Sequence, residues 1–194
     1  MSQEKALSPE ESLKIAQEMM GLTRKSFADN SFYFLLWGWL LLFAGLGEYI
    51  LSAQNFEHPY MVWGIVGFTG GIISSIKGAR ENKKANVATV TDRCVSGVWM
   101  AFIITLFALL ISLVANQNPP NSIVILITGL PTFATGYMLR FNPLIIGGIL
   151  FWAIGIASFF VPIQYSSLFY SAAILVGYLV PGYLLKSAEK NGSV

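Results

Sequence analysis

Six apolar runs, each 18 to 22 residues long, fill most of this chain and constrain its fold more than any other feature. A helix of about 20 apolar residues is long enough to cross the roughly 30 Å hydrocarbon core of a bilayer. We therefore predict an all-α membrane protein, a bundle of six transmembrane helices. The predicted spans are 32–53, 59–76, 95–115, 122–139, 143–161 and 165–185, within a transmembrane domain of residues 32–186.

Composition points in the same direction. The 194 residues are 55% hydrophobic and 11% charged, with a mean hydropathy of +0.62. A soluble domain has about 25% charged residues, so this chain needs lipid as its solvent. The length suits one helical bundle and leaves no room for a second globular domain. With a single cysteine, Cys94, neither an internal disulfide nor a CxxC metal motif can form.

The distribution of basic residues predicts the orientation of the chain. All 12 Lys and Arg residues lie before the first run, between the second and third, between the fourth and fifth, or after the sixth. Because basic loops are retained in the cytoplasm, we predict that both termini are cytoplasmic. A basic cytoplasmic face favours anionic lipid headgroups as partners, rather than nucleic acid.

The segments outside the spans are short. Residues 8–11, Ser-Pro-Glu-Glu, are typical of a helix start, and apolar residues then recur near helical spacing. We predict that residues 1–31 form a cytoplasmic amphipathic helix that lies on the inner leaflet or docks a protein partner, with disorder as a third reading. The polar connection 77–94 should prolong the helices on either side of it, and 187–194 should form a cytoplasmic tail.

A short pattern occurs twice. Residues 136–140 read Gly-Tyr-Met-Leu-Arg and close the fourth run, and residues 182–186 read Gly-Tyr-Leu-Leu-Lys and close the sixth. Counting back gives units of equal length, 95–140 and 141–186, with 32–77 as a third. Units of two spans share one orientation, so three parallel helical hairpins are one interpretation. Chance similarity between apolar helices is the other.

Glu48 is the only acidic or basic residue well inside a predicted span. A carboxylate within a membrane is costly unless it is protonated, paired or hydrated, so it marks a functional position. Ala44 and Gly45 suit close contact with another helix, which predicts that this face points into the bundle. Glu48 then either caps a neighbouring helix, reaches the outer headgroups, or binds a cation, a proton or a polar ligand. Glu57 and His58 in the next turn are candidates to join it in an ion site or proton relay, or are solvated loop residues.

Glycines and prolines supply further candidates. Gly64, Gly67 and Gly71 lie on one face of the second span and predict close helix packing, within one chain or between copies of it. Pro131 and Pro181 predict helix kinks in the fourth and sixth spans. In transporters such breaks can expose backbone carbonyls to a substrate or ion, although many kinks serve structure alone.

Enzyme motifs are missing. One histidine excludes His-Glu-x-x-His, and the chain contains no Gly-x-Ser-x-Gly. With almost no acid, base or nucleophile inside the spans, we predict no catalysis, no cofactor and no bound metal.

Four stretches resemble a known group of sequences. Residues 30–40 read NSFYFLLWGWL, 59–63 read PYMVW, 143–148 read PLIIGG and 181–186 read PGYLLK. Together they resemble a family of uncharacterised six-span inner-membrane proteins of Bacteroidota. The resemblance covers the whole chain and implies a bacterial inner-membrane location, with no activity and no site residues. The six-span plan also resembles that of the substrate-binding subunits of energy-coupling-factor vitamin transporters, in topology alone.

Two classes of function follow from these observations. The first is a small transporter, channel or substrate-binding subunit, in which Glu48 and the kinked fourth and sixth spans line a path. The second is a non-transporting interaction or sensor protein that docks a cytoplasmic partner through its N-terminal helix and the 77–94 loop. A homo-oligomer is compatible with either.

Overall fold

The structure, a computed structural model, describes residues 30–82, 90–115 and 120–191, and every regular element in these ranges is helical. The helices are α2 (Asn30–Ala53), α3 (Met61–Asn82), α4 (Val90–Ala115), α5 (Asn121–Met138), α6 (Asn142–Ser158), the short η1 (Ile163–Tyr165), α7 (Ser166–Ile174), the π-helical η2 (Leu175–Leu179) and α8 (Val180–Asn191). The all-α prediction is confirmed for these ranges. Residues 1–29 of the predicted amphipathic helix lie outside the described residues.

Five of the described helical stretches are long and apolar enough to cross a membrane. They are Ser31–Ala53, Met61–Arg80, Val90–Leu113, Asn121–Met138 and the combined stretch Ile163–Lys190. Helix α6 is equally apolar but shorter, with 17 residues. At about 1.5 Å per residue it extends over roughly 25 Å, somewhat less than the hydrocarbon core of a typical bilayer.

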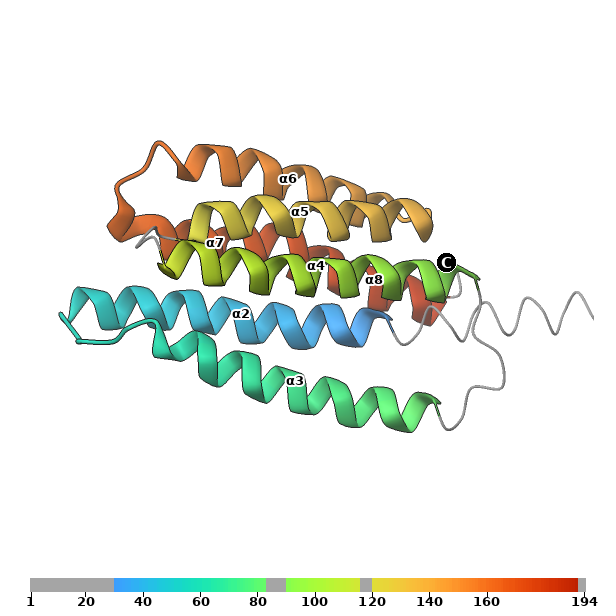
Figure 1. The fold of residues 1–194 in the computed structure, drawn as a ribbon. Helices are drawn as coiled ribbons and strands as arrows, with labels where there is room; N and C mark the ends of the chain where they lie inside the picture. The colour runs from blue at the N-terminus through green and yellow to red at the C-terminus, as the bar shows by residue number, and fades with distance from the viewer. Residues whose placement is uncertain (1–29, 83–89, 116–119, 192–194) are drawn as a thin grey trace, which may run out of the picture.

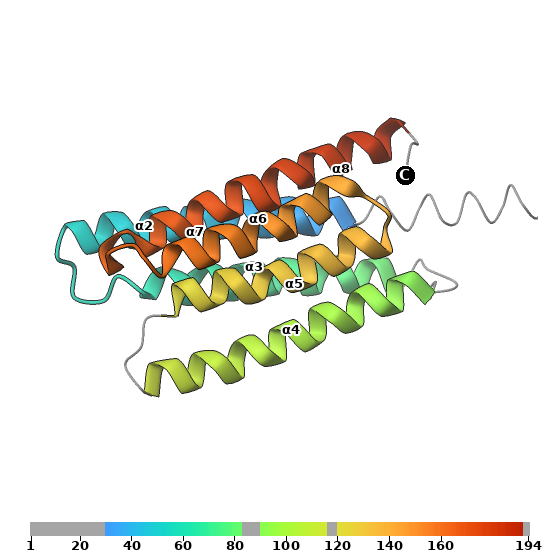
Figure 2. The same ribbon diagram turned by 90° about the horizontal axis from the view of Figure 1, so that it is seen from above.

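The core lies between four parts of the chain. Helix α2 packs against α7, η2 and α8, while α6 packs against α5 and against η2 (Figures 1 and 2). Fully buried side chains of this core include Ala44 of α2, Ile125 of α5, Leu144 and Phe151 of α6, Ile174 of α7 and Leu185 of α8. The burial of large aliphatic and aromatic side chains from distant segments holds these helices together.

Helices α3 and α4 lie at the periphery. Within the described chain, α3 packs mainly on α2, and α4 mainly on α5. Only 6% of the apolar window of each helix is buried, against 44% for α5. Large side chains such as Phe68, Phe107 and Ile111 are therefore exposed. Apolar surface of this extent needs lipid or another protein to cover it.

The most extensive helix contact is between α5 and α6, and glycines let these two helices approach closely. A Cβ added to Gly136 would lie 2.6 Å from the backbone nitrogen of Ile145, and one added to Gly148 would lie 2.7 Å from that of Phe133. Gly129 and Gly155 would meet side chains at similarly short distances. Small residues of this kind let two helix backbones approach directly. Helix α5 belongs to the proposed hairpin unit 95–140 and helix α6 to the unit 141–186, so this contact joins two units.

The glycines of the second predicted span lie in a different environment. A Cβ added to Gly64, Gly67 or Gly71 would have no neighbour within 4 Å, whereas one on Gly70 would lie 2.9 Å from the ring of Trp37. Among the described residues, therefore, none packs against Gly64, Gly67 or Gly71. Contact between copies of the chain stays a prediction.

The two prolines have different local structures. Helix α5 runs unbroken through Pro131, and the hydroxyl of Thr132 donates to the carbonyl of Thr128 one turn back. Before Pro181 the helix changes to the π-helical η2. Since proline has no N–H to donate, a wider turn at this point is physically reasonable. The irregularity allows a second close crossing, in which the carbonyl of Gly177 faces Gly147 of α6.

The repeated five-residue pattern does not have one structure. At residues 136–140 helix α5 ends, and Arg140 takes a positive φ of 53°. At residues 182–186 the chain stays helical, because α8 continues to Asn191. The two copies therefore differ in backbone structure, and the interpretation as three parallel hairpins stays a prediction. The prediction that residues 77–94 prolong their neighbours is confirmed at its described ends, since α3 reaches Asn82 and α4 begins at Val90.

The described basic residues gather at one end of the bundle. This basic end holds the start of α2, the end of α3, the start of α4, the α5–α6 turn and α8 (right in Figure 1). Its described Lys and Arg residues are Lys77, Arg80, Arg93, Arg140, Lys186 and Lys190. Here the hydroxyl of Ser31 donates to the carboxylate of Glu189 at 2.5 Å, and this bond ties the start of α2 to α8.

Candidate functional site

Glu48 faces other helices, near the opposite end of the bundle. We call this the pocket end; it holds the end of α2, the starts of α3, α5 and α7, and the end of α6. One turn before Glu48, Ala44 has no exposed surface, and a Cβ added to Gly45 would meet the Ser171 hydroxyl and lie 3.0 Å from the Ser167 carbonyl. Helix α2 therefore approaches α7 closely at Gly45. The predicted inward orientation of this face is confirmed.

The carboxylate of Glu48 accepts hydrogen bonds from two other helices. The hydroxyl of Ser167 on α7 donates to Glu48 Oε2 at 2.7 Å, and the side-chain amide of Asn121 on α5 donates to the same oxygen at 3.4 Å. The Asn121 amide nitrogen also lies 3.0 Å from Ser166 Oγ and 3.3 Å from Ser167 Oγ. These four residues, which we call the Glu48 network, join α2, α5 and α7 in a largely apolar bundle.

Two helix N-termini lie beside this carboxylate. Asn121 is the first residue of α5 and Ser166 is the first of α7, and neither helix has a side-chain N-cap hydrogen bond. A helix N-terminus carries a partial positive charge of roughly half an elementary charge. The partial positive charges of α5 and α7 therefore offset part of the charge of Glu48, in a region where the described chain has no Lys or Arg side chain. The geometry matches the reading in which Glu48 contacts a neighbouring helix, rather than the outer headgroups.

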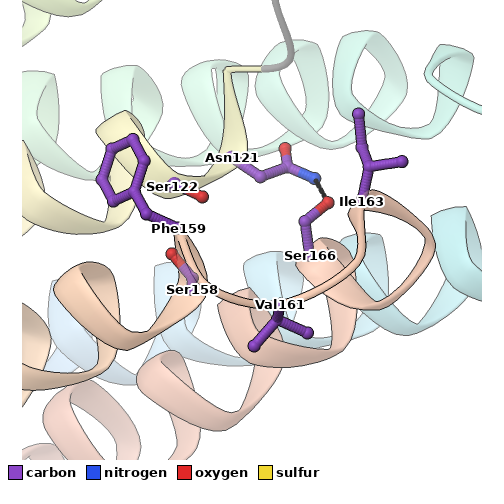
Figure 3. Close-up of a pocket in the computed structure, with 7 residues that line it drawn as sticks. All are labelled: Asn121, Ser122, Ser158, Phe159, Val161, Ile163 and Ser166. Carbon is purple, nitrogen blue, oxygen red and sulfur yellow. Dashed lines mark hydrogen bonds between the residues drawn. The ribbon is translucent and has the colours of Figure 1, made fainter.

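A small pocket opens next to the network. Its volume is about 150 Å³. Four of its lining residues are polar, Asn121, Ser122, Ser158 and Ser166, and three are apolar, Phe159, Val161 and Ile163. Figure 3 shows Asn121 and Ser166 pointing toward one another across the wall of this pocket. A space of this size with several hydroxyl and amide groups suits a few water molecules or one small polar solute.

Asn121 and Ser166 belong both to the pocket wall and to the Glu48 network. On one side they line the pocket. On the other, the Asn121 amide reaches Glu48 and Ser167. A molecule that bonds to Asn121 from the pocket would therefore compete with Glu48 for the same amide. The arrangement links the occupant of the pocket to the hydrogen bonds of the Glu48 carboxylate.

Glu57 and His58 do not join this network. Both are exposed, and the His58 ring nitrogen Nδ1 is 2.8 Å from the hydroxyl of Tyr60. Among the residues that the structure describes, no three His, Cys, Asp or Glu side chains lie close enough together to hold a metal ion. The proposed metal-binding group of Glu48, Glu57 and His58 is therefore wrong for the described structure, and the exposure of Glu57 and His58 agrees with the alternative of solvated loop residues.

Sequence reasoning missed Asn121, Ser166 and Ser167. They are 73, 118 and 119 positions after Glu48, and only the folded topology brings them together. A signal was present in the sequence, because each stands at the outer boundary of an apolar run. Polar residues at helix starts usually serve as caps, so nothing in the pattern separated these from ordinary helix boundaries.

Comparison with known proteins gives no assignment. No protein-family model matches the chain, and neither a curated protein nor a solved structure shows significant similarity to it. The resemblance to Bacteroidota membrane proteins therefore stays an expectation, and the function must be inferred from the residues themselves.

Proposed function

We propose that the protein is a six-span inner-membrane protein that takes up or captures a small polar solute or ion at its pocket end. It would act as a small transporter, a channel or a substrate-binding subunit, with both termini cytoplasmic. Glu48 and the Glu48 network would form the selective part of the path. The second candidate, docking of a cytoplasmic partner, depends on residues 1–28, which lie outside the described structure.

One observation carries this proposal. The Glu48 carboxylate faces α5 and α7 behind a polar pocket, instead of facing lipid. Ionisable groups within a membrane bundle are expensive to maintain and commonly mark ion or substrate paths. A carboxylate with a purely structural role would need no adjoining pocket, whereas a binding site needs a space beside its polar groups.

The rest of the molecule supports a membrane location. Helices α3 and α4 expose large apolar side chains along their length, as helices in contact with lipid do. The described basic residues lie together at the other end from the pocket. With the basic end in the cytoplasm, the pocket would open to the outside.

A ligand screen with a cysteine reporter tests the proposal. In a Cys94→Ala background, the chain is free of cysteine, and Ser122→Cys places one thiol in the pocket wall. We expect a membrane-impermeant maleimide to label this thiol from outside. Among a panel of small polar solutes and inorganic salts, a ligand should slow the labelling and raise the melting temperature of the purified protein.

Glu48→Gln keeps the size of the side chain and removes its charge, so it should abolish both effects of the ligand. Ser75→Ala, on the exposed surface of α3 toward the basic end, is the matched control and should leave both unchanged. The proposal fails if the thiol cannot be labelled from either side. It also fails if cells tolerate Glu48→Gln but lose function when residues 1–28 are deleted, because that result favours the docking protein.

A further inference from the structure

We infer that the Glu48 network binds a monovalent cation of about the size of sodium. This inference rests on the proposed function and names the ion that the site would take. It depends on the arrangement of oxygen atoms around the Asn121 amide, on the single charge of Glu48 and on the charge of the pocket end.

Three side-chain oxygens surround the amide nitrogen of Asn121. They are Ser166 Oγ at 3.0 Å, Ser167 Oγ at 3.3 Å and Glu48 Oε2 at 3.4 Å. The NH₂ group carries a partial positive charge and has only two hydrogens to share among these three acceptors. The amide therefore occupies a small cage of oxygens that comes from two other helices.

A change of side-chain orientation would convert this cage into a cation site. A half-turn about the last side-chain bond of Asn121 exchanges its nitrogen for its oxygen, and serine hydroxyls can rotate to present lone pairs. Four oxygens from Glu48, Asn121, Ser166 and Ser167 would then converge without any movement of the backbone. Carboxylate, amide and hydroxyl oxygens are ligands of hard cations, and water from the pocket could complete the coordination shell.

The charge of the network selects a monovalent ion. Glu48 is its single carboxylate, so a cation with one charge leaves the site neutral, while a divalent ion would leave an uncompensated charge inside the bundle. Calcium takes six to eight oxygens and usually several carboxylates. Glu57, the other described acidic residue at this end, is exposed in the loop after α2.

The pocket end also favours the approach of cations. Its described acidic residues are Glu48 and Glu57, and the described Lys and Arg residues lie at the basic end. A cleft with charge of one sign raises the local concentration of the opposite ion. A cation that enters the pocket meets Asn121 and Ser166 first, and Glu48 and Ser167 lie behind them.

The test is the melting temperature of purified full-length protein in detergent, at constant ionic strength, with sodium, potassium or N-methylglucamine chloride. Sodium should raise the melting temperature up to a saturating concentration, because an ion that binds only the folded protein stabilises the folded state. Glu48→Gln should abolish the sodium effect. Ser167→Ala and Ser166→Ala, which each remove one oxygen, should raise the sodium concentration for half-maximal effect about tenfold. Ser158→Ala lines the pocket but contributes no cage oxygen, so its response should match the wild type.

The outcomes separate the two proposals. If sodium stabilises wild type and Glu48→Gln equally, or stabilises neither, the cation inference is wrong. If, in addition, a solute still protects the Ser122→Cys thiol in N-methylglucamine chloride, the proposed function stands without a cation. Should Glu48→Gln fail to fold, the serine variants decide: an unchanged sodium response in both overturns the inference.

Discussion

Arg140 adopts a backbone conformation that residues other than glycine and asparagine rarely hold. Its φ is 53°, and it directly follows the last turn of α5. The N–H of Arg140 donates to the carbonyl of Tyr137, and the N–H of Phe141 donates to the carbonyl of Gly136. This is the Schellman arrangement, in which the left-handed position normally belongs to glycine. Asn55 takes the same position after α2, where asparagine is better suited.

Arg140→Gly should therefore stabilise the folded protein by about 1 kcal/mol, the approximate cost of a left-handed conformation for a side chain with a Cβ. The measurement is the melting temperature in detergent. Arg140→Lys is the control, since it keeps both the charge and the Cβ and should give no gain. Equal gains for the two variants would contradict this explanation, because the lysine keeps the Cβ that the left-handed conformation disfavours.

At the same scale, the sequence identified Glu48 and its inward face, but none of its partners. A lone carboxylate in an apolar run is visible in a sequence because it is costly inside a bilayer unless some partner, water or proton compensates it. A hydroxyl or amide at a helix start costs little wherever it lies, so Asn121, Ser166 and Ser167 carried no comparable signal. The pairing of Glu48 with Ser167 depends on Gly45, whose missing side chain lets α2 approach α7.

Among the elements, the α5–α6 pair shows where close packing is built. Helix positions and approximate bounds followed from apolar length, because that length reflects a bilayer rather than a particular neighbour. The length of the apolar runs did not predict which helices pack against one another. Glycine spacing drew attention to Gly64, Gly67 and Gly71, which have open space around them, while Gly136 and Gly148 lie against a backbone. Which glycine meets a helix depends on the rotation of each helix about its axis, and nearly uniform apolar sequence does not fix that rotation.

Gly148→Ala should destabilise the bundle by about 1–3 kcal/mol, the usual cost of overpacking, because its Cβ would meet the backbone of Phe133. Gly67→Ala adds the same methyl group on α3, where nothing lies within 4 Å, and should leave the melting temperature of the monomer unchanged. A loss of stability in Gly67→Ala that depends on protein concentration would instead reveal contact between copies of the chain.

For the whole molecule, the separation of charge between its two ends predicts how it lies in the membrane. Cys94 is exposed near the start of α4, at the basic end, and Gln164 is exposed in η1 at the pocket end. Because basic segments stay in the cytoplasm, the two positions should lie on opposite sides of the bilayer.

In intact spheroplasts, a membrane-impermeant maleimide should leave Cys94 unlabelled until the membrane is permeabilised. The variant Cys94→Ala/Gln164→Cys should be labelled at once. The reverse pattern would place the basic end outside and contradict the proposed orientation, and labelling of both in intact spheroplasts would contradict a membrane-spanning bundle.

The contact of the first described helix with the last ones also sets an order of events during synthesis. Glu48 enters the membrane with α2, but Asn121 follows 73 residues later and Ser167 follows 119 residues later. Until α7 arrives, the carboxylate lacks its shortest hydrogen bond, and the Gly45 face of α2 lacks its neighbour. Since chains are made from the N-terminus, the bundle can close only after α7 has been made. In a chain that stops after α6, the face of α2 that packs against α7 would stay uncovered. Such a chain would be a substrate for membrane quality-control proteases.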